Sequence, residues 1–458
     1  MKNSHDPSSP TTDREGRLAP PEPSDFPVPT DVQDSTERPV SHPQKSSFVN
    51  FLQEFSIPLI AGVLCALAWA NLGHESYHAF LHWVPAALHD IHLFHHGLFY
   101  FLVNDIFMVF FFGIAAKEIT EAALPGGQLN PPKKAMNPLF ATIGGVAGPV
   151  GVFFALMAAA VGAGAFAAGT DSALLNRGWG IPTATDIALA WLVARAVFGA
   201  KHPAVSFLLL LAVADDAIGL GIIAIFYGDP QNPAEPAYLG LVLAGMAIAY
   251  ALRKKDVQSW VPYVFLAGPL SWAGLILAHL HPALALVFIV PFLPGPRRDT
   301  GLFIKKDEVD VMGDETASDL GIDHSPLHNF EHALKLPVDF GLFFFGVANA
   351  GVEFAGIGAM TWVILGALVI GKTIGIGVLA VIAHKIGFSF PANMGAKEAF
   401  MAGFVAALGL TVALFVAGAA FPTDMDLQGQ AKMGALFSGL VGFAAIIVGR
   451  AIGIRRMN

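Results

Sequence analysis

Long apolar runs, each about as long as a bilayer is thick, follow one another along the sequence after a polar N-terminal stretch. A helix needs about 20 apolar residues to cross the hydrocarbon core, and fewer where a break interrupts it, so these runs predict about twelve membrane-spanning helices. Their expected ranges are 55–72, 97–121, 137–165, 181–198, 204–227, 237–252, 259–279, 281–295, 334–352, 358–384, 396–421 and 433–454.

Two polar regions interrupt this pattern. Residues 1–50 are rich in Pro, Ser and charge, a composition typical of a disordered tail. Residues 296–329 contain too few apolar side chains for a core, which predicts a long flexible loop. We therefore expect a tail at 1–50 and a transmembrane domain at 51–458 that includes this loop.

Composition supports a polytopic, all-α membrane protein. Hydrophobic residues make up 54% of the chain and charged residues 13%, about half the charged fraction of a typical soluble domain. The single cysteine, Cys65, excludes an intrachain disulfide and a thiolate metal cluster. No cofactor and no nucleic-acid partner is expected; the partner is the lipid bilayer.

Basic residues gather in alternate connections, which indicates the orientation in the membrane. The opposite connections carry little beyond Arg177 and Lys432. By the positive-inside rule, both termini are expected on the cytoplasmic side of the membrane. The basic residues on that side are Lys117, Lys133, Lys134, Arg195, Lys201, Arg253, Lys254, Lys255, Arg297, Arg298, Lys305, Lys306, Lys385, Lys397, Arg450, Arg455 and Arg456.

One apolar run, LLLLAVADDAIGLGIIAIFY, carries two adjacent carboxylates, Asp215 and Asp216, near its middle. An aspartate at the bilayer centre costs roughly 2.5–3.5 kcal/mol, and a second one beside it adds repulsion. A chain keeps such a pair when the protein compensates it or when it takes part in a mechanism.

Further polar residues interrupt other apolar runs. WGIPTATDIALAWL places Thr185 and Asp186 in a span broken by Pro182, and MTWVILGALVIGKTIGIGVLAVIAH places Lys372 midway along its span. Asp105, in LVNDIFMVFF, lies nearer the end of a span and is a secondary candidate. In the 137–165 span, ATIGGVAGPVG has two glycines at GxxxG spacing, which predicts close helix packing.

A single Asp–Lys pair could serve only to hold two helices together. Three acids and one base at mid-depth leave an excess negative charge, which protons or a cation must balance. Burial and a neighbouring acid both favour the protonated carboxyl group, while hard oxygen ligands suit Na⁺ or Li⁺, so the two can compete for one site. Asp215 and Asp216, with Thr185, are therefore the expected cation- and proton-binding residues.

The sequence resembles the NhaA family of bacterial Na⁺/H⁺ antiporters over roughly residues 50–455. The matching segments are PTATDIALA, AVADDAIGLGIIAIFY, HLHPALALV, FEHALKLPVDFGLFFFGVANAGV and VIGKTIGIG, together with IGG in the third span. The resemblance implies a fold of inverted repeats, for which this family is itself a standard example. It also implies twelve helices, of which the fourth and the eleventh are broken, near Pro182 and near Gly409, and cross.

The resemblance implies roles for individual residues. Asp216 and Asp215 match the family's cation-binding and proton-carrying carboxylates, and Asp186 and Lys372 match the acid and base that compensate the half-helix ends. Exchange of two protons for each Na⁺ or Li⁺, electrogenic and pH-regulated, is then expected. Glu331, His332 and His281 match the family's pH-regulation positions, although Ala115 and Glu118 depart from its pattern. Asn349 is a further secondary candidate, and a homodimer is expected.

Rival functions remain at the level of sequence. A sodium-coupled organic solute symporter of similar fold is the alternative, although it would need more polar residues around the broken helices. An intramembrane aspartyl protease is rejected, because adjacent aspartates on one helix point about 100° apart. A buried carboxylate site also disfavours a channel. We therefore expect a secondary transporter and no enzyme.

Overall fold

The computed structural model describes most of the predicted transmembrane domain. Its described residues are 56–91, 94, 97–124, 132–167, 169–228, 233–295, 325–391, 393–454 and 456–457. Within these ranges all regular secondary structure is helical, which confirms the all-α prediction. The predicted tail at 1–50 and residues 296–324 of the predicted loop lie outside the described residues.

The helices follow the predicted order along the chain, and short 3₁₀ or π segments carry the label η. The first part contains α2 (Ile57–Leu72), α3 (His74–Leu81), η1 (Ala86–Leu88), α4 (Leu98–Phe101), η3 (Leu102–Phe107), α5 (Met108–Ala123), α6 (Pro132–Gly162), α7 (Ser172–Asn176), η4 (Arg177–Thr183), α8 (Ile187–Phe198) and α9 (Pro203–Phe226). The middle part contains η5 (Pro236–Tyr238), α10 (Leu239–Lys254), η6 (Tyr263–Ala267), α11 (Gly268–Leu277), η7 (Pro282–Phe288) and η8 (Val290–Phe292). The last part contains α14 (Pro326–Asn349), η9 (Phe354–Gly356), α15 (Ala359–Gly366), η10 (Ala367–Gly371), α16 (Lys372–Lys385), α17 (Ala396–Ala406), α18 (Leu410–Ala420), α19 (Met425–Ser438) and α20 (Val441–Ala451).

Length and apolar composition qualify many of these helices as membrane spans. In the described ranges, six continuous helices meet the criterion: Leu98–Ala123, Ala135–Gly162, Pro203–Phe226, Pro236–Lys254, Ala359–Lys385 and Met425–Ala451. Two bent pairs bring the number to eight, and three shorter apolar helices correspond to the predicted first, seventh and eighth spans. The ninth corresponds to α14. Each predicted range thus contains a helix, and twelve crossings stay a prediction.

Some predicted boundaries and loop positions were wrong, because polar helix starts escape a hydropathy pattern. Helix α14 begins at Pro326, inside the predicted loop, where the Ser325 hydroxyl accepts a hydrogen bond from His328 N at 3.2 Å. Helix α19 begins at Met425, after the N-cap residue Asp424. Lys432, which we placed in a loop, therefore lies within α19. Capping side chains of this kind stabilise a helix start without any apolar signal.

Two helices are broken, as the resemblance implied. The segment Ser172–Thr183 bends by 51° from Ile187–Phe198, and Ala396–Ala406 bends by 52° from Leu410–Ala420. Pro182 lies in η4, just before the first break, and Gly409 precedes α18 at the second. Because breaks leave backbone groups without helical partners, they are tolerated at membrane depth only where the protein satisfies those groups.

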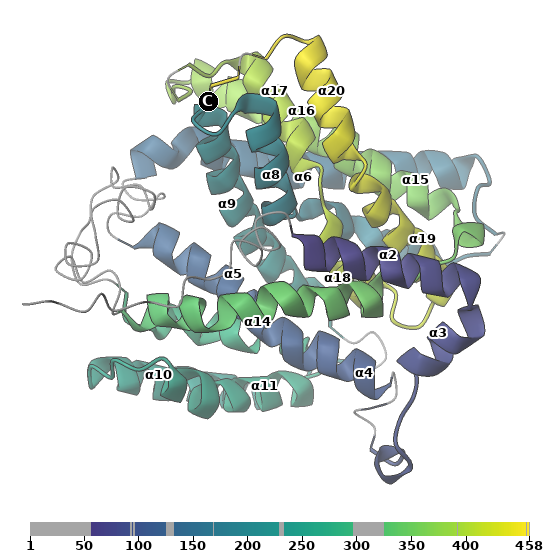
Figure 1. The fold of residues 1–458 in the computed structure, drawn as a ribbon, viewed down its shortest axis with the longest axis vertical. Coiled ribbons are helices and arrows are strands. Elements are labelled where there is room, and N and C mark those ends of the chain that lie inside the picture. The colour runs from purple at the N-terminus through teal and green to yellow at the C-terminus, as the bar shows by residue number, and fades with distance from the viewer. Residues whose placement is uncertain are drawn as a thin grey trace, which may run out of the picture. The chain divides into compact units, whose positions relative to one another are not determined.

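The glycines of the predicted GxxxG motif permit close packing of α6 against α16. A Cβ added at Gly144 would lie 2.0 Å from the carbonyl oxygen of Gly375, and one added at Gly148 would lie 2.4 Å from that of Gly371. Only glycine allows this backbone contact, so the prediction of close packing is confirmed. Figure 1 shows other close pairs, with α14 beside α2 and α8 beside α9.

Candidate functional site

The two helix breaks touch each other, and the candidate site lies where they meet. The backbone N–H of Asp186, in the first break, donates to the carbonyl of Leu408, in the second, at 2.7 Å. A Cβ added at Gly409 would lie 3.1 Å from the Ala184 carbonyl oxygen. We call this meeting point of the breaks 184–186 and 407–409 the crossing.

Asp186 caps two helices at the crossing. As the N-cap residue of α8, it accepts a hydrogen bond from Leu189 N at 3.1 Å. Its second carboxylate oxygen accepts from Thr411, from the backbone N at 3.3 Å and from the hydroxyl at 3.0 Å. Thr411 lies in the first turn of α18, so one carboxylate serves the N-terminal ends of both half-helices. A negative charge there is stabilised by the partial positive charge of each helix end.

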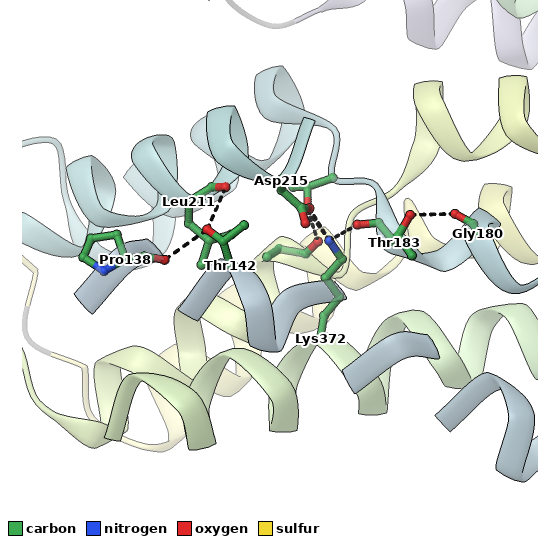
Figure 2. Close-up of polar contacts among 9 residues, drawn as sticks. Pro138, Thr142, Gly180, Thr183, Leu211, Asp215 and Lys372 are labelled. Atoms are coloured by element: carbon green, nitrogen blue, oxygen red, sulfur yellow. Dashed lines mark hydrogen bonds and ion pairs between the residues drawn. The ribbon is translucent and has the colours of Figure 1, made fainter. Parts of the chain in front are cut away.

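Lys372 occupies the opposite electrostatic position. Its side chain is fully buried, and its ammonium donates to the Thr183 carbonyl at 2.5 Å and to the Thr185 hydroxyl at 2.9 Å. It also forms an ion pair with Asp215, which Figure 2 shows together with the Thr183 contact. Thr183 ends η4, so the base lies at a carbonyl end of a half-helix, where a positive charge is favourable.

The π-helical segment η10 directly precedes Lys372. Such segments widen one turn of a helix, and they often occur at functional sites. Here the wider turn directly precedes Lys372, whose ammonium contacts Asp215 of α9 and Thr183 of η4.

Thr185 connects Asp215 to the second broken helix. Its hydroxyl lies 2.8 Å from Asp215 Oδ2 and 3.0 Å from the carbonyl oxygen of Ala406, which ends α17. A hydroxyl has one hydrogen, so Thr185 can donate to only one of these acceptors at a time. The choice gives the site a second hydrogen-bonding state without any movement of the backbone.

The two aspartates of α9 each keep one buried oxygen without a partner. Asp215 is fully buried, and its Oδ1 has no hydrogen-bond donor, although Oδ2 has several. Oδ1 of Asp216 is likewise buried and unpartnered. Buried polar atoms are normally satisfied, so each such atom requires an explanation, for instance an ion or a proton. Unpartnered carboxylate oxygens are the ligands that a small hard cation needs.

A transition-metal centre is not what these residues form. No group of three or more His, Cys, Asp or Glu side chains comes together as a metal site in the part of the chain that the structure describes. The oxygen atoms around Asp215 come from carboxylates, a hydroxyl and backbone carbonyls, which suit Na⁺ or Li⁺ better than a metal bound by His and Cys.

The residues predicted for pH regulation have separate surroundings. The Glu331 carboxylate pairs with the buried Lys117 of α5 and lies 4.0 Å from Lys335. His332 is exposed, and its ring lies 6.5 Å from that of His328. The His281 ring packs 4.5 Å from that of Phe415, and its buried Nδ1 has no partner.

The secondary candidates lie at a contact between η3 and the end of α14. The Asn349 side-chain amide donates to Asn104 Oδ1 at 2.9 Å, and both residues are buried. Asp105 follows Asn104 in η3, and its backbone carbonyl accepts from the Trp272 indole N–H at 2.8 Å. Asn349 thus bonds Asn104, the residue before Asp105. Within the described ranges, no hydrogen bond or ion pair joins Asn349 or Asp105 to the residues of the crossing.

Sequence reasoning missed three polar residues that the structure buries. Thr411 bonds Asp186, Lys117 pairs with Glu331, and Lys432 lies within α19. Lys117 and Lys432 were taken only as markers of connections, although a lysine within an apolar run is itself a signal of function. For Thr411 the available signal was its place two residues after Gly409, where a polar side chain can bond a helix start.

Comparison with known proteins gives matches along almost the whole described chain. The sequence model of the family "Na+/H+ antiporter 1" matches residues 46–451. The Na(+)/H(+) antiporter NhaA of Desulfitobacterium hafniense (strain DSM 10664 / DCB-2) is 58% identical over 411 residues, which are 90% of this chain and 97% of the relative. That of Geobacter sulfurreducens is 56% identical over 409 residues, 89% of this chain and 99% of the relative. That of Jannaschia sp. (strain CCS1) is 41% identical over 439 residues, which cover 89% of this chain and 99% of the relative.

Proposed function

Because the chain belongs to the Na⁺/H⁺ antiporter 1 family, we propose that it exchanges Na⁺ for protons at the Asp215–Asp216 pair. The chain is a multi-pass membrane transporter and not an enzyme. The observation that carries the assignment of the site is that each of these two neighbouring aspartates has one buried carboxylate oxygen without a donor. Li⁺ has the same preference for oxygen ligands and is a second transported cation.

The ion pair between Lys372 and Asp215 gives the exchange its coupling. In the structure the ammonium of Lys372 donates to Asp215 Oδ2. A cation that enters beside Asp216 competes for Asp215, so the pair breaks and Lys372 turns wholly to Thr183 and Thr185. Protons that return to the site displace the cation, because a protonated carboxyl group is a weak ligand. Asp216 loses a proton when the cation binds, and Lys372 loses one when its pair with Asp215 breaks. Two protons therefore leave for each Na⁺ that enters, which makes the exchange electrogenic.

Asp186 and Lys372 also act as charge compensation for the half-helix ends. Asp186 accepts hydrogen bonds from the first turns of α8 and α18, and Lys372 donates to the carbonyl end of η4. Without these charges, two helix termini of the same polarity would face each other at membrane depth. This compensation supports a role for both residues in holding the crossing together.

The proposal also covers the orientation, the assembly and the regulation of the protein. The basic connections support cytoplasmic termini in a bacterial inner membrane, with Na⁺ exported and protons imported, and the chain acts as a homodimer. The Glu331–Lys117 pair supports pH regulation at the start of α14. Since His281 packs on Phe415, it contributes to regulation separately from Glu331 and His332.

No observation favours the symporter alternative. A cavity of about 240 Å³ lies between α5, α9 and η7–η8, and its lining is apolar apart from Thr120. An organic solute requires several convergent polar groups in its pocket. The residues that line this cavity do not supply them.

The test is exchange in everted membrane vesicles. Respiration acidifies the vesicles, and a dye that follows the pH gradient reports proton loss when Na⁺, Li⁺ or K⁺ is added at mildly acidic to mildly alkaline pH. We expect Na⁺ and Li⁺ to restore the quenched fluorescence of the dye, and we expect Asp216→Asn to abolish this response. Asp426→Asn, at an exposed position in the first turn of α19, is the matched control that keeps it.

Two outcomes would contradict the proposal. If Na⁺/H⁺ exchange persisted in Asp216→Asn, the cation would not bind at the Asp215–Asp216 pair. No response of the folded wild type to any of the three cations would direct the search to solute uptake. Electrogenicity is tested separately, because Asp215→Asn leaves one carboxylate and should reduce or abolish the current in proteoliposomes.

A further inference from the structure

Lys432 is a buried lysine that the site described above does not use. It lies near the middle of α19 and is 6% exposed. Among the described residues, its ammonium has no hydrogen-bond or ion-pair partner. A lysine at membrane depth is costly, and this position therefore requires a reason.

Helix α19 runs antiparallel to α18, from its far end back to the crossing. At the far end, the Gln428 side chain donates to the Phe421 carbonyl at 2.9 Å. At the crossing, the Ser438 hydroxyl accepts from the Gly409 backbone N–H at 3.1 Å. Lys432 lies between these two contacts, so it stands on the α18 side of the crossing.

The side chain of Lys432 faces α18 and not α15. Lys432 follows Gln428 by four residues, which turns it only about 40° around the helix. Gly434 is about 200° away from Lys432 and packs on α15, where an added Cβ would lie 2.7 Å from the Thr361 carbonyl oxygen. The ammonium is therefore directed into the same part of the bundle that α18 occupies.

A purely structural explanation does not fit this lysine. Lysines near helix ends commonly extend their ammonium to the aqueous interface. Lys432 lies eight residues after Asp424, about 12 Å along the helix, and the residue is only 6% exposed. A buried pair is also excluded within the described residues, because no acid contacts the ammonium.

We propose that Lys432 is a positioning residue for transport, whose positive charge weakens cation binding at the crossing and so permits release. The proposal rests on the proposed function. Ser438 is about 9 Å further along the helix, and packed helix axes are about 8–10 Å apart, so the ammonium is roughly 10–15 Å from the crossing. At an effective dielectric constant of about 20, one charge at that distance changes cation affinity about 6- to 16-fold.

This charge would offset part of the negative excess at the site. Lys372 pairs with Asp215 and with neither Asp216 nor Asp186 among the described residues, so an approaching Na⁺ is strongly attracted when the carboxylates are ionised. A second positive charge lowers that attraction without occupying the site. Tight binding without such a charge would slow release, because an ion that binds more strongly leaves more slowly.

The test compares variants that remove or keep the charge, reconstituted in proteoliposomes. We expect Lys432→Met and Lys432→Gln to lower the KM for Na⁺ by about 6- to 16-fold, with a lower maximal rate. Lys432→Arg keeps the charge and should keep the wild-type KM. Lys397→Met, at an exposed lysine of α17, is the matched control and should change neither quantity.

Each other outcome overturns the proposal. If the KM for Na⁺ of the neutral variants stayed within about twofold of the wild-type value, the charge of Lys432 would have no electrostatic effect on cation binding. The same holds if Lys432→Arg shifts the KM as much as Lys432→Met, because side-chain shape would then be the cause. Removal of an unpaired buried charge should also raise the unfolding temperature. If both neutral variants unfolded at a lower temperature than the wild type, Lys432 would instead form a bond that stabilises the fold. A wild type without exchange would instead reject the proposed function.

Discussion

The ammonium of Lys372 has three hydrogens, and each of them has an acceptor at the crossing: the Thr183 carbonyl, the Thr185 hydroxyl and the Asp215 carboxylate. Asp215 by contrast keeps one oxygen unpartnered. The base is thus saturated while the acid retains capacity for another ligand. In the proposed exchange, this asymmetry would allow a cation or a proton to enter at the acid without first removing the base.

The energetic dependence of Asp215 on Lys372 can be measured with a double-mutant cycle. Lys372→Met leaves the Asp215 carboxylate buried without its counter-charge, and loss of one partner from a buried pair costs about 3–5 kcal/mol unless the other is neutralised. We expect Lys372→Met to lower the unfolding temperature in detergent clearly. The double variant Lys372→Met/Asp215→Asn should recover most of the loss. If the losses of the two single variants simply add in the double variant, the pair does not couple them.

Single residues differed in how far the sequence could predict them. Asp215, Asp216, Asp186 and Lys372 were identifiable because a charge within an apolar run is expensive. Their contacts were not, since the Lys372–Asp215 bond joins residues 157 positions apart along the chain. The double cap that Asp186 forms with Thr411 depends on the angle at which two broken helices meet, and no local pattern encodes that angle.

At the scale of elements, hydropathy located the helices, and local polar chemistry decided where they begin. Each predicted range contains a helix, and both predicted breaks are present. The starts of α14 and α19 were displaced by polar first turns, which hydropathy scores as loop. The π-helical segments were not foreseen either, because a single widened turn leaves the average hydropathy of a span unchanged.

Helix α3, which lies outside the candidate spans, carries a row of histidines with a testable pH dependence. The ring centroids of His74 and His78 are 4.3 Å apart, those of His78 and His82 are 5.8 Å apart, and His74 pairs with Glu353. Burial lowers the pKa of His78, the neighbouring His74 and His82 lower it further, and Glu353 opposes them. The folded helix therefore binds a proton at His78 less readily than the unfolded chain does.

The sign of the effect on α3 follows from that lowered pKa. Stability contributed by neutral His78 is complete above its ordinary pKa of about 6.5 and falls as the pH drops below it, because the unfolded state takes up the proton first. We expect the α3 amides to lose protection against hydrogen exchange between about pH 7.5 and about pH 5.5, after correction for intrinsic rates. His78→Gln should flatten this dependence. Protection that rises toward acid pH would show that the His74–Glu353 pair dominates instead.

At the scale of the whole transmembrane unit, the crossing depends on helices that do not contribute a charge to it. Helix α6 packs closely on α16 and η10, and it also contacts α9 and η4. It therefore lies against the elements that carry Lys372, Asp215 and Thr183. We therefore expect the glycine contacts of α6 to help set the distance between the base and the acid.

This dependence gives a prediction that separates packing from chemistry on a single helix. Gly144→Ala places a methyl group 2.0 Å from the Gly375 carbonyl oxygen, a contact that the backbone must relieve by moving α16 and with it Lys372. We expect a lower unfolding temperature together with at least a tenfold loss of Na⁺-dependent exchange, because about 1.4 kcal/mol of misplacement at the site corresponds to that factor. Gly151→Ala is the matched control on α6, since a Cβ at this position meets nothing within 4 Å. Alanine favours a helix over glycine by up to about 1 kcal/mol, so this variant should be fully active and at least as stable as the wild type. If Gly144→Ala behaved like Gly151→Ala in both measurements, the α6–α16 contact would not position the crossing, and the placement of Lys372 would have to come from η10 and α17 alone.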